Sequence, residues 1–267
     1  MIWAKRLAYI VLLVSFGCAP AEEESKATRA APAGVVSPVE FIAEGEEGRS
    51  RVRLAGVQPP PPGETAAAAE ARLGELIAGA GVRLTPAGPG EDRYGRTIAH
   101  VEAGQGEAAV WVQGVMVGEG LLAAASYADT RDRTPALLAL EREARAARRG
   151  GWGSGDFAVL DPDPNRLAQR LDSRVIVEGR VIDVSPPIRG RVFVNFGLDW
   201  RTDFTAAIPA DALDLFEDAS LDPAALEGAQ VRVRGWVYEE NGPMMRIDHP
   251  EAIELVDAPE PRRPGGG

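Results

Sequence analysis

The sequence predicts a mixed α+β protein, mainly β, in which two five-stranded barrels accompanied by helices follow one another along the chain. Three observations predict it. Short stretches that alternate apolar and polar residues recur through both halves of the 267 residues, as is typical of strands. Helical patterns stand between some of these stretches in each half. A segment rich in Gly, Asp and Pro, residues 155–170, separates the halves and is expected to be a linker.

The first domain is expected over residues 35–154. Strands are predicted over 35–44, 49–57, 82–85 and 97–102. Helices are predicted over 64–80, 108–119 and 134–149, and 121–127 continues the core. In the first helix, Leu73, Ile77 and Ala80 recur at helical spacing, and Gly81 is expected to end it. The domain therefore combines a barrel with a helical layer.

The second domain is expected over residues 171–258. Its predicted strands are 175–184, 192–196, 204–208, 231–238 and 244–247, with a last apolar segment at 253–256. Short helical pieces are predicted at 210–216 and 223–226. Asn241-Gly242 is a hairpin signal. Five strands with a helix before the fourth predict a barrel of the OB type.

The N-terminal segment has the pattern of an export signal. Lys5 and Arg6 precede an apolar run over 7–16 that is too short to span a bilayer, and Cys18, the single cysteine, follows. This resembles a bacterial lipoprotein signal over 1–18, with lipid attached to Cys18; cleavage after Ala21 is the alternative. Either interpretation predicts an exported protein, anchored to the envelope and facing the periplasm or secreted into it.

Composition predicts the segments around the domains and limits the ligands. Residues 19–34 read as a flexible spacer, and residues 259–267 as a disordered tail. The net charge of −11 opposes non-specific binding to nucleic acid, because an acidic surface repels phosphates. Binding of a nucleic acid would therefore need a local cluster of arginines.

Three strings identify a family resemblance. They are RVRLAGV from Arg51, DRYGRTIAHV from Asp92 and EREARAARRGGWG from Glu141. In this order and at these spacings they resemble the staphylococcal nuclease-like (thermonuclease) family across residues 35–154. The resemblance implies an OB-type barrel that hydrolyses phosphodiesters with calcium. In that chemistry, carboxylates hold the metal and activate water, and two arginines neutralise the phosphate.

The arginine half of this chemistry is present. Arg53 and Arg96 stand at the family's two arginine positions, which implies a retained phosphate-binding site. A solvated arginine on a strand or turn is the alternative for each. Tyr94 and Tyr127 match family positions near the nucleotide pocket, and packing beside the barrel is their alternative.

The acidic half is missing. Gln58 stands where the resemblance expects a metal-binding Asp, and Pro61 where it expects a Glu that acts as base. The turn at 36–39 carries no carboxylate. A relocated ligand could come only from nearby glutamates, which otherwise read as a solvated charged face: Glu40, Glu44, Glu46 and Glu47. We therefore expect no metal site and no cofactor, unless these acids have taken over calcium binding.

The second domain offers a further ligand-binding candidate. Trp200 and Arg201 fall beside its predicted second and third strands, the face on which OB barrels bind oligomers. Asp199 and Asp203 balance the local charge, and core packing of Trp200 and Phe204 is the alternative.

Taken together, the residues predict an exported thermonuclease-family protein that has lost catalysis. It would bind single-stranded nucleic acid, a nucleotide or an envelope protein. The alternative is an active metal-dependent nuclease with relocated acids, so the sequence leaves open whether the protein is an enzyme. A purely architectural envelope protein is a third interpretation.

Overall fold

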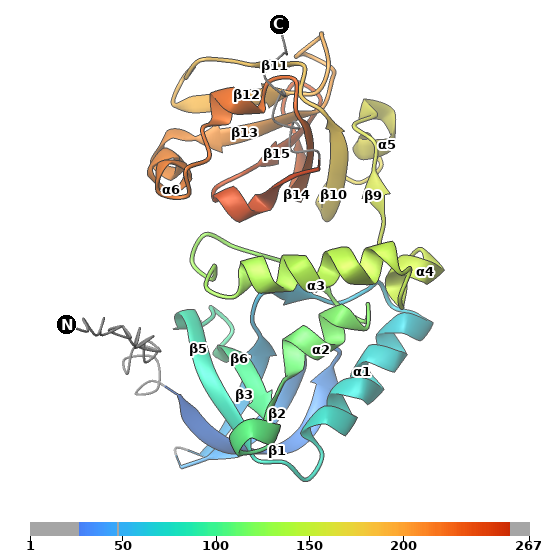
Figure 1. Ribbon diagram of the computed structural model, residues 1–267, viewed down its shortest axis with the longest axis vertical. Helices are drawn as coiled ribbons and strands as arrows, with labels where there is room; N and C mark the ends of the chain where they lie inside the picture. The colour runs from blue at the N-terminus through green and yellow to red at the C-terminus, as the bar shows by residue number, and fades with distance from the viewer. Residues whose placement is uncertain (1–26, 47, 257–267) are drawn as a thin grey trace, which may run out of the picture.

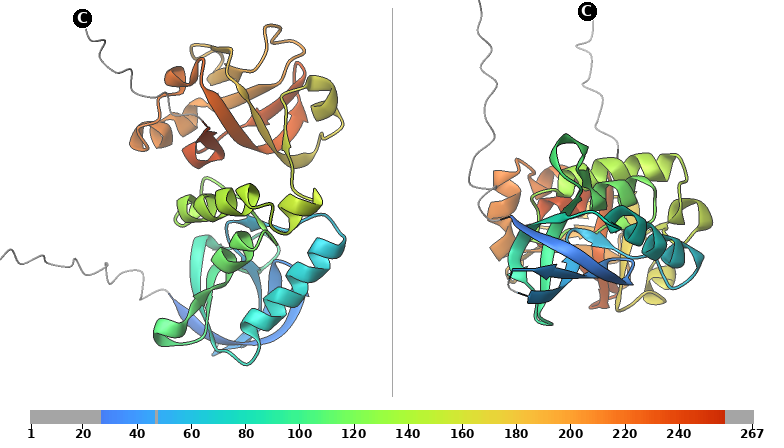
Figure 2. Two further views of the ribbon diagram at one scale, coloured as in Figure 1. Left: turned by 45° about the vertical axis from the view of Figure 1, so that its right-hand side comes forward. Right: turned by 90° about the horizontal axis from the view of Figure 1, so that it is seen from below.

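A computed structural model of the chain describes residues 27–46 and 48–256 (Figures 1 and 2). They form two sheet-based domains stacked end to end, with helix α3 (Thr134–Ala146) between them. The predicted signal segment and Cys18, and the predicted tail, lie outside the described residues. Within the described part, no helix has both the length and the apolar character needed to cross a membrane.

The first domain is a closed five-stranded barrel. Its strands follow the order β3-β2-β1-β5-β6, and a parallel pairing of β3 with β6 closes the ring. A short strand, β7, extends the sheet beside β6. The bounds are β1 (Thr28–Ser37), β2 (Glu40–Gly45), β3 (Gly48–Leu54), β5 (Val82–Glu91), β6 (Arg96–Ala103) and β7 (Val110–Trp111). The α+β barrel predicted for this domain is confirmed.

The barrel begins earlier in the chain than the sequence suggested. Strand β1 starts at Thr28, inside the segment expected to be a flexible spacer up to residue 34. Thr28–Ala30 pair with β5, and the rest of β1 pairs with β2 across a register shift near Pro32. This stretch has few apolar side chains, so its order comes from backbone pairing to two neighbouring strands rather than from burial.

Three helices cover the first barrel. They are α1 (Glu64–Ile77), α2 (Val112–Gly118) and α3, and Figure 2 shows them on one side of the sheet. Helix α1 buries Leu73 and Ile77, as the helical periodicity predicts. The 108–119 helix is shorter than predicted, because a 3-10 turn (Gly106–Ala108) and β7 occupy its first residues. A two-stranded pairing of β4 (Val57–Gln58) with β8 (Ala123–Ala124) completes the side that faces the second domain.

The segment expected to link the domains is largely built into the second one. Helix α4 (Gly151–Ser154) ends the first domain, and β9 (Val159–Leu160) then pairs in parallel with β10. Helix α5 (Pro164–Ala168) is capped by Asp163, whose side chain accepts a hydrogen bond from the Asn165 N–H at 2.9 Å. Leu167 on α5 is fully buried in the second core.

The second domain is an eight-stranded sheet. Its main path is β11-β12-β13-β15-β14-β10-β9, and β16 pairs with β14. The bounds are β10 (Ser173–Arg180), β11 (Asp183–Val184), β12 (Arg191–Asn195), β13 (Thr205–Pro209), β14 (Gln230–Glu239), β15 (Pro243–Arg246) and β16 (Ile253–Leu255). The end strands of this path, β9 and β11, do not pair within the described residues, so the sheet path does not close and the predicted second barrel is not confirmed.

A separate core lies under this sheet. Helix α6 (Leu213–Asp218) and 3-10 turns at Ala210–Ala212, Pro223–Leu226 and Pro250–Ala252 cover it. Phe204 and Phe216 are fully buried there, and Phe204 packs on Phe196 with ring centroids 5.1 Å apart. The packing alternative is therefore confirmed for Phe204.

The two domains meet through buried polar groups. Arg234 on β14 bonds to Glu141 on α3 at 3.0 Å and to Glu254 on β16, and its side chain is 1% exposed. Glu141 also accepts the Ala124 N–H at 2.7 Å. Arg131 and Glu251 form a second bridge across the interface. Because buried charges are tolerated when they are paired, these bonds fix the placement of the domains, although the Arg234 Nε has no hydrogen-bond partner among the described residues.

Candidate anion-binding site

Strand register brings the two predicted arginines together. Strands β3 and β6 run in parallel, with Arg51 opposite Arg96 and Arg53 opposite Ile98. Residues two apart on a strand project from the same face, so Arg51 and Arg53 share a face with Arg96 beside them. The chain then leaves β3 through Gly56, whose φ of +71° suits glycine. The expected pairing of Arg53 and Arg96 is thus a consequence of barrel closure.

Arg53 carries a charge that no carboxylate pairs among the described residues. Its Nη1 donates to the Leu54 carbonyl at 3.0 Å and its Nη2 to the Val57 carbonyl at 2.9 Å. Burial lowers the pKa of the Arg53 guanidinium, and the nearby Tyr127 phenol partly opposes this effect. A guanidinium has five N–H donors, so three remain for a ligand.

Arg96, by contrast, is held by two carboxylates. Its Nε donates to Asp92 at 2.8 Å and its Nη1 to Glu40 at 3.1 Å. The hydrogen bond to Asp92 is the main cause that raises the Arg96 pKa. Burial alone would raise the pKa of Asp92, but bonds from Arg96 and from the Tyr94 N–H lower it. Glu40 also accepts a bond from Arg51, so both acids are occupied by arginines.

The two arginines line one cavity of about 250 Å³. Its other polar side chains are Asp92, Tyr127, Asp129 and Thr130. Thr130 is 5% exposed, and its Oγ1 has no hydrogen-bond partner in the part of the chain that the structure describes. An unpaired buried hydroxyl costs free energy, which a bound acceptor or donor would recover. The cavity has room for a small charged group rather than for a drug-sized molecule.

Two exposed tyrosines flank this cavity. Tyr127 lines it and is 46% exposed. Tyr94 is 65% exposed, and the guanidiniums of Arg93 and Arg96 lie 5.0 and 5.2 Å from its ring centroid. Neither ring is packed into the core, and exposed aromatic rings of this kind can stack a planar group.

Gln58 and Pro61, the positions at which the resemblance expects acids, do not line the cavity of Arg53 and Arg96. Gln58 pairs with Ala123 in the β4–β8 ladder, and Gln58 and Pro61 line a different cavity, of about 310 Å³, which the second domain also lines. Within residues 27–46 and 48–256, no three His, Cys, Asp or Glu side chains are grouped so as to hold a metal ion. The residues present therefore do not fit the calcium ion that the resemblance implies.

The predicted ligand residues of the second domain are only partly brought to a cavity. Trp200 is 51% exposed and lines a cavity of about 420 Å³ together with Phe193 and Arg191. Arg201 lies over the Trp200 ring at 4.4 Å and is not among the lining residues. This cavity lies by β11 and β12, at the end of the second domain remote from the first (Figure 1). It is therefore separate from the arginine cavity.

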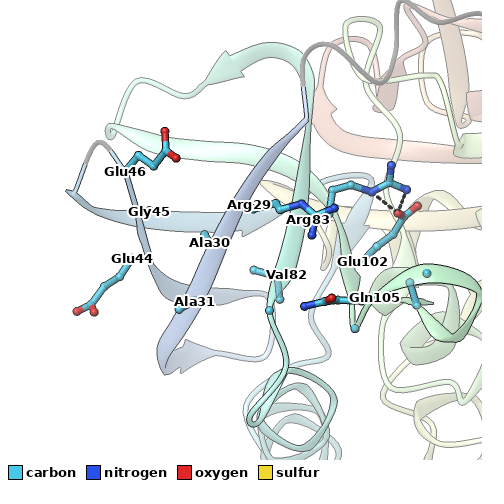
Figure 3. Close-up of a pocket in the computed structure, with 14 residues that line it drawn as sticks. Arg29, Ala30, Ala31, Glu44, Gly45, Glu46, Val82, Arg83, Glu102 and Gln105 are labelled. Atoms are coloured by element: carbon cyan, nitrogen blue, oxygen red, sulfur yellow. Dashed lines mark hydrogen bonds and ion pairs between the residues drawn. The ribbon is translucent and has the colours of Figure 1, made fainter.

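A further cavity lies in the first domain, away from the two predicted arginines. It measures about 620 Å³ and lies where β1, the β2–β3 turn and β5 meet, with Arg29 on its wall (Figure 3). Figure 3 shows Arg83 reaching Glu102, and Glu44 and Glu46 on the opposite side. Much of the wall is glycine, alanine and backbone, which no motif marks.

A second polar chain at the interface was not expected from the sequence. His249 Nε2 lies 2.7 Å from the Ser126 Oγ, and His249 Nδ1 lies 2.7 Å from Asp248. The order of groups is that of a hydrolytic triad, but Ser126 and His249 are 1% and 4% exposed. A hydroxyl so buried meets no substrate, so the chain ties the two domains together. Only the tertiary structure could reveal it, because its members are distant in sequence.

Comparison with protein families matches part of the first domain. Residues 51–154 match the family model described as staphylococcal nuclease homologue. The matched segment starts within β3 and ends with α4, so β1 and β2, which complete the barrel, precede it. No curated protein matches the chain.

Proposed function

Because residues 51–154 form a domain of the staphylococcal nuclease family, we propose that the domain binds single-stranded nucleic acid or a nucleotide without hydrolysing it. One observation carries the proposal. Arg53 presents an unpaired guanidinium to a small cavity, beside the paired Arg96. A phosphate would accept bonds from the free N–H groups of Arg53.

The surrounding groups support a nucleotide rather than a bare phosphate. The Tyr127 phenol lines the same cavity and can bond to phosphate or sugar oxygens. The exposed faces of Tyr94 and Tyr127 offer stacking surfaces for bases. Each stacked base adds about 1–3 kcal/mol to binding, largely independent of sequence.

Loss of hydrolysis is supported by the state of the nearby acids. Glu40, the one predicted substitute near the arginines, is bound to Arg51 and Arg96, and Asp92 is bound to Arg96. Neither is free to bind a metal or to accept a proton from water. Asp129 is exposed at the cavity wall, and this observation keeps the active nuclease as the second candidate.

We propose that the second domain is an OB-type barrel with a bent first strand. Strands β10 and β11 are separated only by Val181 and Ile182, and they lie near opposite ends of the sheet path. The Ile182 N–H donates to the Asn195 carbonyl at 2.8 Å, which continues the pairing through the bend. We also keep the proposals that the protein is exported and anchored through Cys18. Loss of membrane association in Cys18→Ala tests the anchor.

Binding of a nucleoside 3′,5′-bisphosphate, measured by calorimetry at several salt concentrations, tests the ligand. The parent protein should bind with an affinity that falls as salt rises, because phosphate binding releases counterions. Arg53→Met should weaken binding at least tenfold. Arg29→Met is the matched control, since Arg29 is exposed and lies at a different cavity, and it should leave affinity unchanged. Equal affinities in parent and Arg53→Met would refute the proposal and leave the scaffold interpretation.

Hydrolysis is tested separately with labelled single-stranded DNA and calcium. We expect no cleavage that EDTA abolishes. Cleavage that is lost in both Arg53→Met and Asp129→Asn would instead establish the active nuclease.

A further inference from the structure

The second domain carries an exposed tryptophan beside Arg174, the residue that reaches Tyr127 of the first domain. Trp236 on β14 is 55% exposed and lies opposite Arg174 in the antiparallel pairing of β10 with β14. Residues directly opposite in such a pair project from the same face of the sheet. Arg234, two residues before Trp236, shares that face and is buried against Glu141 and the Ala124 carbonyl. Trp236 therefore lies at the margin of the interface.

Arg174 connects this tryptophan with the first-domain site. Its Nη2 donates to the Ser126 carbonyl at 2.9 Å, and its guanidinium lies 4.9 Å from the centroid of the Tyr127 ring. Tyr127 in turn lines the cavity of Arg53 and Arg96. A line of residues thus runs from the first domain, across the interface, to Trp236: Arg174 lies over the Tyr127 ring, and Trp236 is the cross-strand neighbour of Arg174. We call it the aromatic–arginine path, and its members are Tyr94, Arg96, Tyr127, Arg174 and Trp236.

Among the described residues, three arginines on or beside this path have no ion-pair partner, whereas Arg96 on the path is paired with Glu40 and Asp92. Arg53, Arg93 and Arg174 have no ion-pair partner among the described residues, although the chain carries a net charge of −11. Arg93 lies over Tyr94, and Arg174 over Tyr127. Unpaired arginines beside exposed aromatic rings form the combination that binds single strands, since rings stack bases and guanidiniums attract phosphates.

We propose that a single strand of nucleic acid bound at the Arg53 cavity continues over Tyr127 and Arg174 onto Trp236, so that the second domain supplies half of the binding surface. The inference rests on the function proposed above. It assigns the second domain a role at the interface, through Trp236, rather than at the remote cavity of Trp200. At that cavity Arg201 lies 3.9 Å from Asp199, so its charge is partly balanced.

Bonds across the interface allow the residues of this path to act as one surface. The buried bonds of Arg234, and the hydrogen bond between His249 and Ser126, hold Arg174 and Tyr127 in place. Because both rings are already in place, binding of a nucleic-acid strand does not have to order the two domains relative to each other, and that free-energy cost is avoided.

Binding of two probes to four proteins tests the proposal. The probes are the nucleoside bisphosphate and a labelled dT₁₂ oligonucleotide; the proteins are the parent and its Trp236→Ala, Trp236→Phe and Trp200→Ala variants. Trp236→Ala should weaken dT₁₂ binding by about five- to a hundredfold, because a stacked base is lost. It should leave the bisphosphate affinity unchanged. Trp236→Phe should restore most of the affinity, and dT₁₂ should quench tryptophan fluorescence less in Trp236→Phe than in the parent.

Trp200→Ala is the matched control, since Trp200 is exposed to a similar extent and also lies beside an arginine. It should bind dT₁₂ like the parent. If Trp236→Ala binds dT₁₂ like the parent while the bisphosphate still binds, the path onto the second domain is overturned and the first-domain function stands. If Trp200→Ala, rather than Trp236→Ala, weakens dT₁₂ binding, the path is also overturned. If the parent binds neither probe, both proposals fail.

Discussion

Arg53 and Arg234 both lie on strands, and burial acts on the pKa of each. The protein supplies carboxylate partners to Arg234 but none to Arg53 among the described residues. Arg234 is bonded to Glu141, Glu254 and the Ala124 carbonyl, and its pKa is raised, because these two carboxylates outweigh burial. Arg53 bonds only to carbonyls, and burial lowers its pKa. A charge whose partners are all within the protein maintains structure. A charge that lacks an anionic partner is where an anionic ligand gains most.

The largest effect on the free energy of unfolding is expected from replacing the buried Arg234. Arg234→Met removes the fully buried cation that bonds to both Glu141 and Glu254 and leaves them the less buried Arg145, and the Ala124 carbonyl loses a hydrogen-bond donor. Breaking a buried pair on one side costs about 3–5 kcal/mol. Urea denaturation should show this loss. A double variant, Arg234→Met with Glu141→Leu, should recover part of it, because an apolar replacement removes one stranded charge. Stability equal to the parent in Arg234→Met would contradict the structural role.

His100 shows a third way to treat a buried ionisable group, which is to keep it neutral. Burial lowers its pKa to about 4, and Arg133 adds to the effect. An unfolded histidine has a pKa of about 6.5, so the unfolded chain binds the proton first as the pH falls. The contribution of neutral His100 to the free energy of unfolding is therefore fully present above pH ~6.5. It decreases below that pH, by about 2 kcal/mol between pH 6.5 and 5. His100→Gln should flatten this part of the stability profile, measured by urea denaturation at each pH. A profile unchanged from the parent would assign the slope to another group.

The order of strands and helices could be predicted because apolar periodicity is a local property. Leu73 and Ile77 mark α1, and the alternation over 231–238 marks β14, whose bounds are Gln230–Glu239. The same reasoning could not find the start of β1 at Thr28, because backbone pairing with β2 and β5 orders that strand. Order that depends on neighbours distant in sequence leaves no periodic signal.

The sequence could predict the two arginines of the candidate site, but not which groups each of them is bonded to. The family strings located Arg53 and Arg96, and barrel closure brings both to one cavity. Nothing local indicates that Asp92 and Glu40 occupy Arg96 while Arg53 stays without a carboxylate. Trp236, in the second domain, was missed because alternation marked its strand and not its exposure beside the interface.

Arg53→Met sharpens the contrast with Arg234 directly. The substitution removes two hydrogen bonds to carbonyls, each worth about 0.5–1.5 kcal/mol, and it also removes a partly buried unpaired charge. These effects oppose each other, so we expect a loss of about 1 kcal/mol in the free energy of unfolding, together with the loss of ligand binding. A destabilisation as large as that of Arg234→Met would show that Arg53 is a structural residue.

The smallest effect on the free energy of unfolding is expected at an ion pair that has good hydrogen-bond geometry but is partly exposed to water. Arg191 and Glu240 in the second domain form two parallel hydrogen bonds, at 2.8 and 2.5 Å, and their side chains are 28% and 38% exposed. Water and salt screen such a pair, so Arg191→Met should cost less than about 1 kcal/mol, and less still at high salt. Denaturation at low and high salt measures both. A cost near that of Arg234→Met would mean that bidentate geometry alone sets the energy. A small cost means that burial, rather than bidentate geometry, separates an arginine that maintains the fold from one whose ion pair adds little to stability.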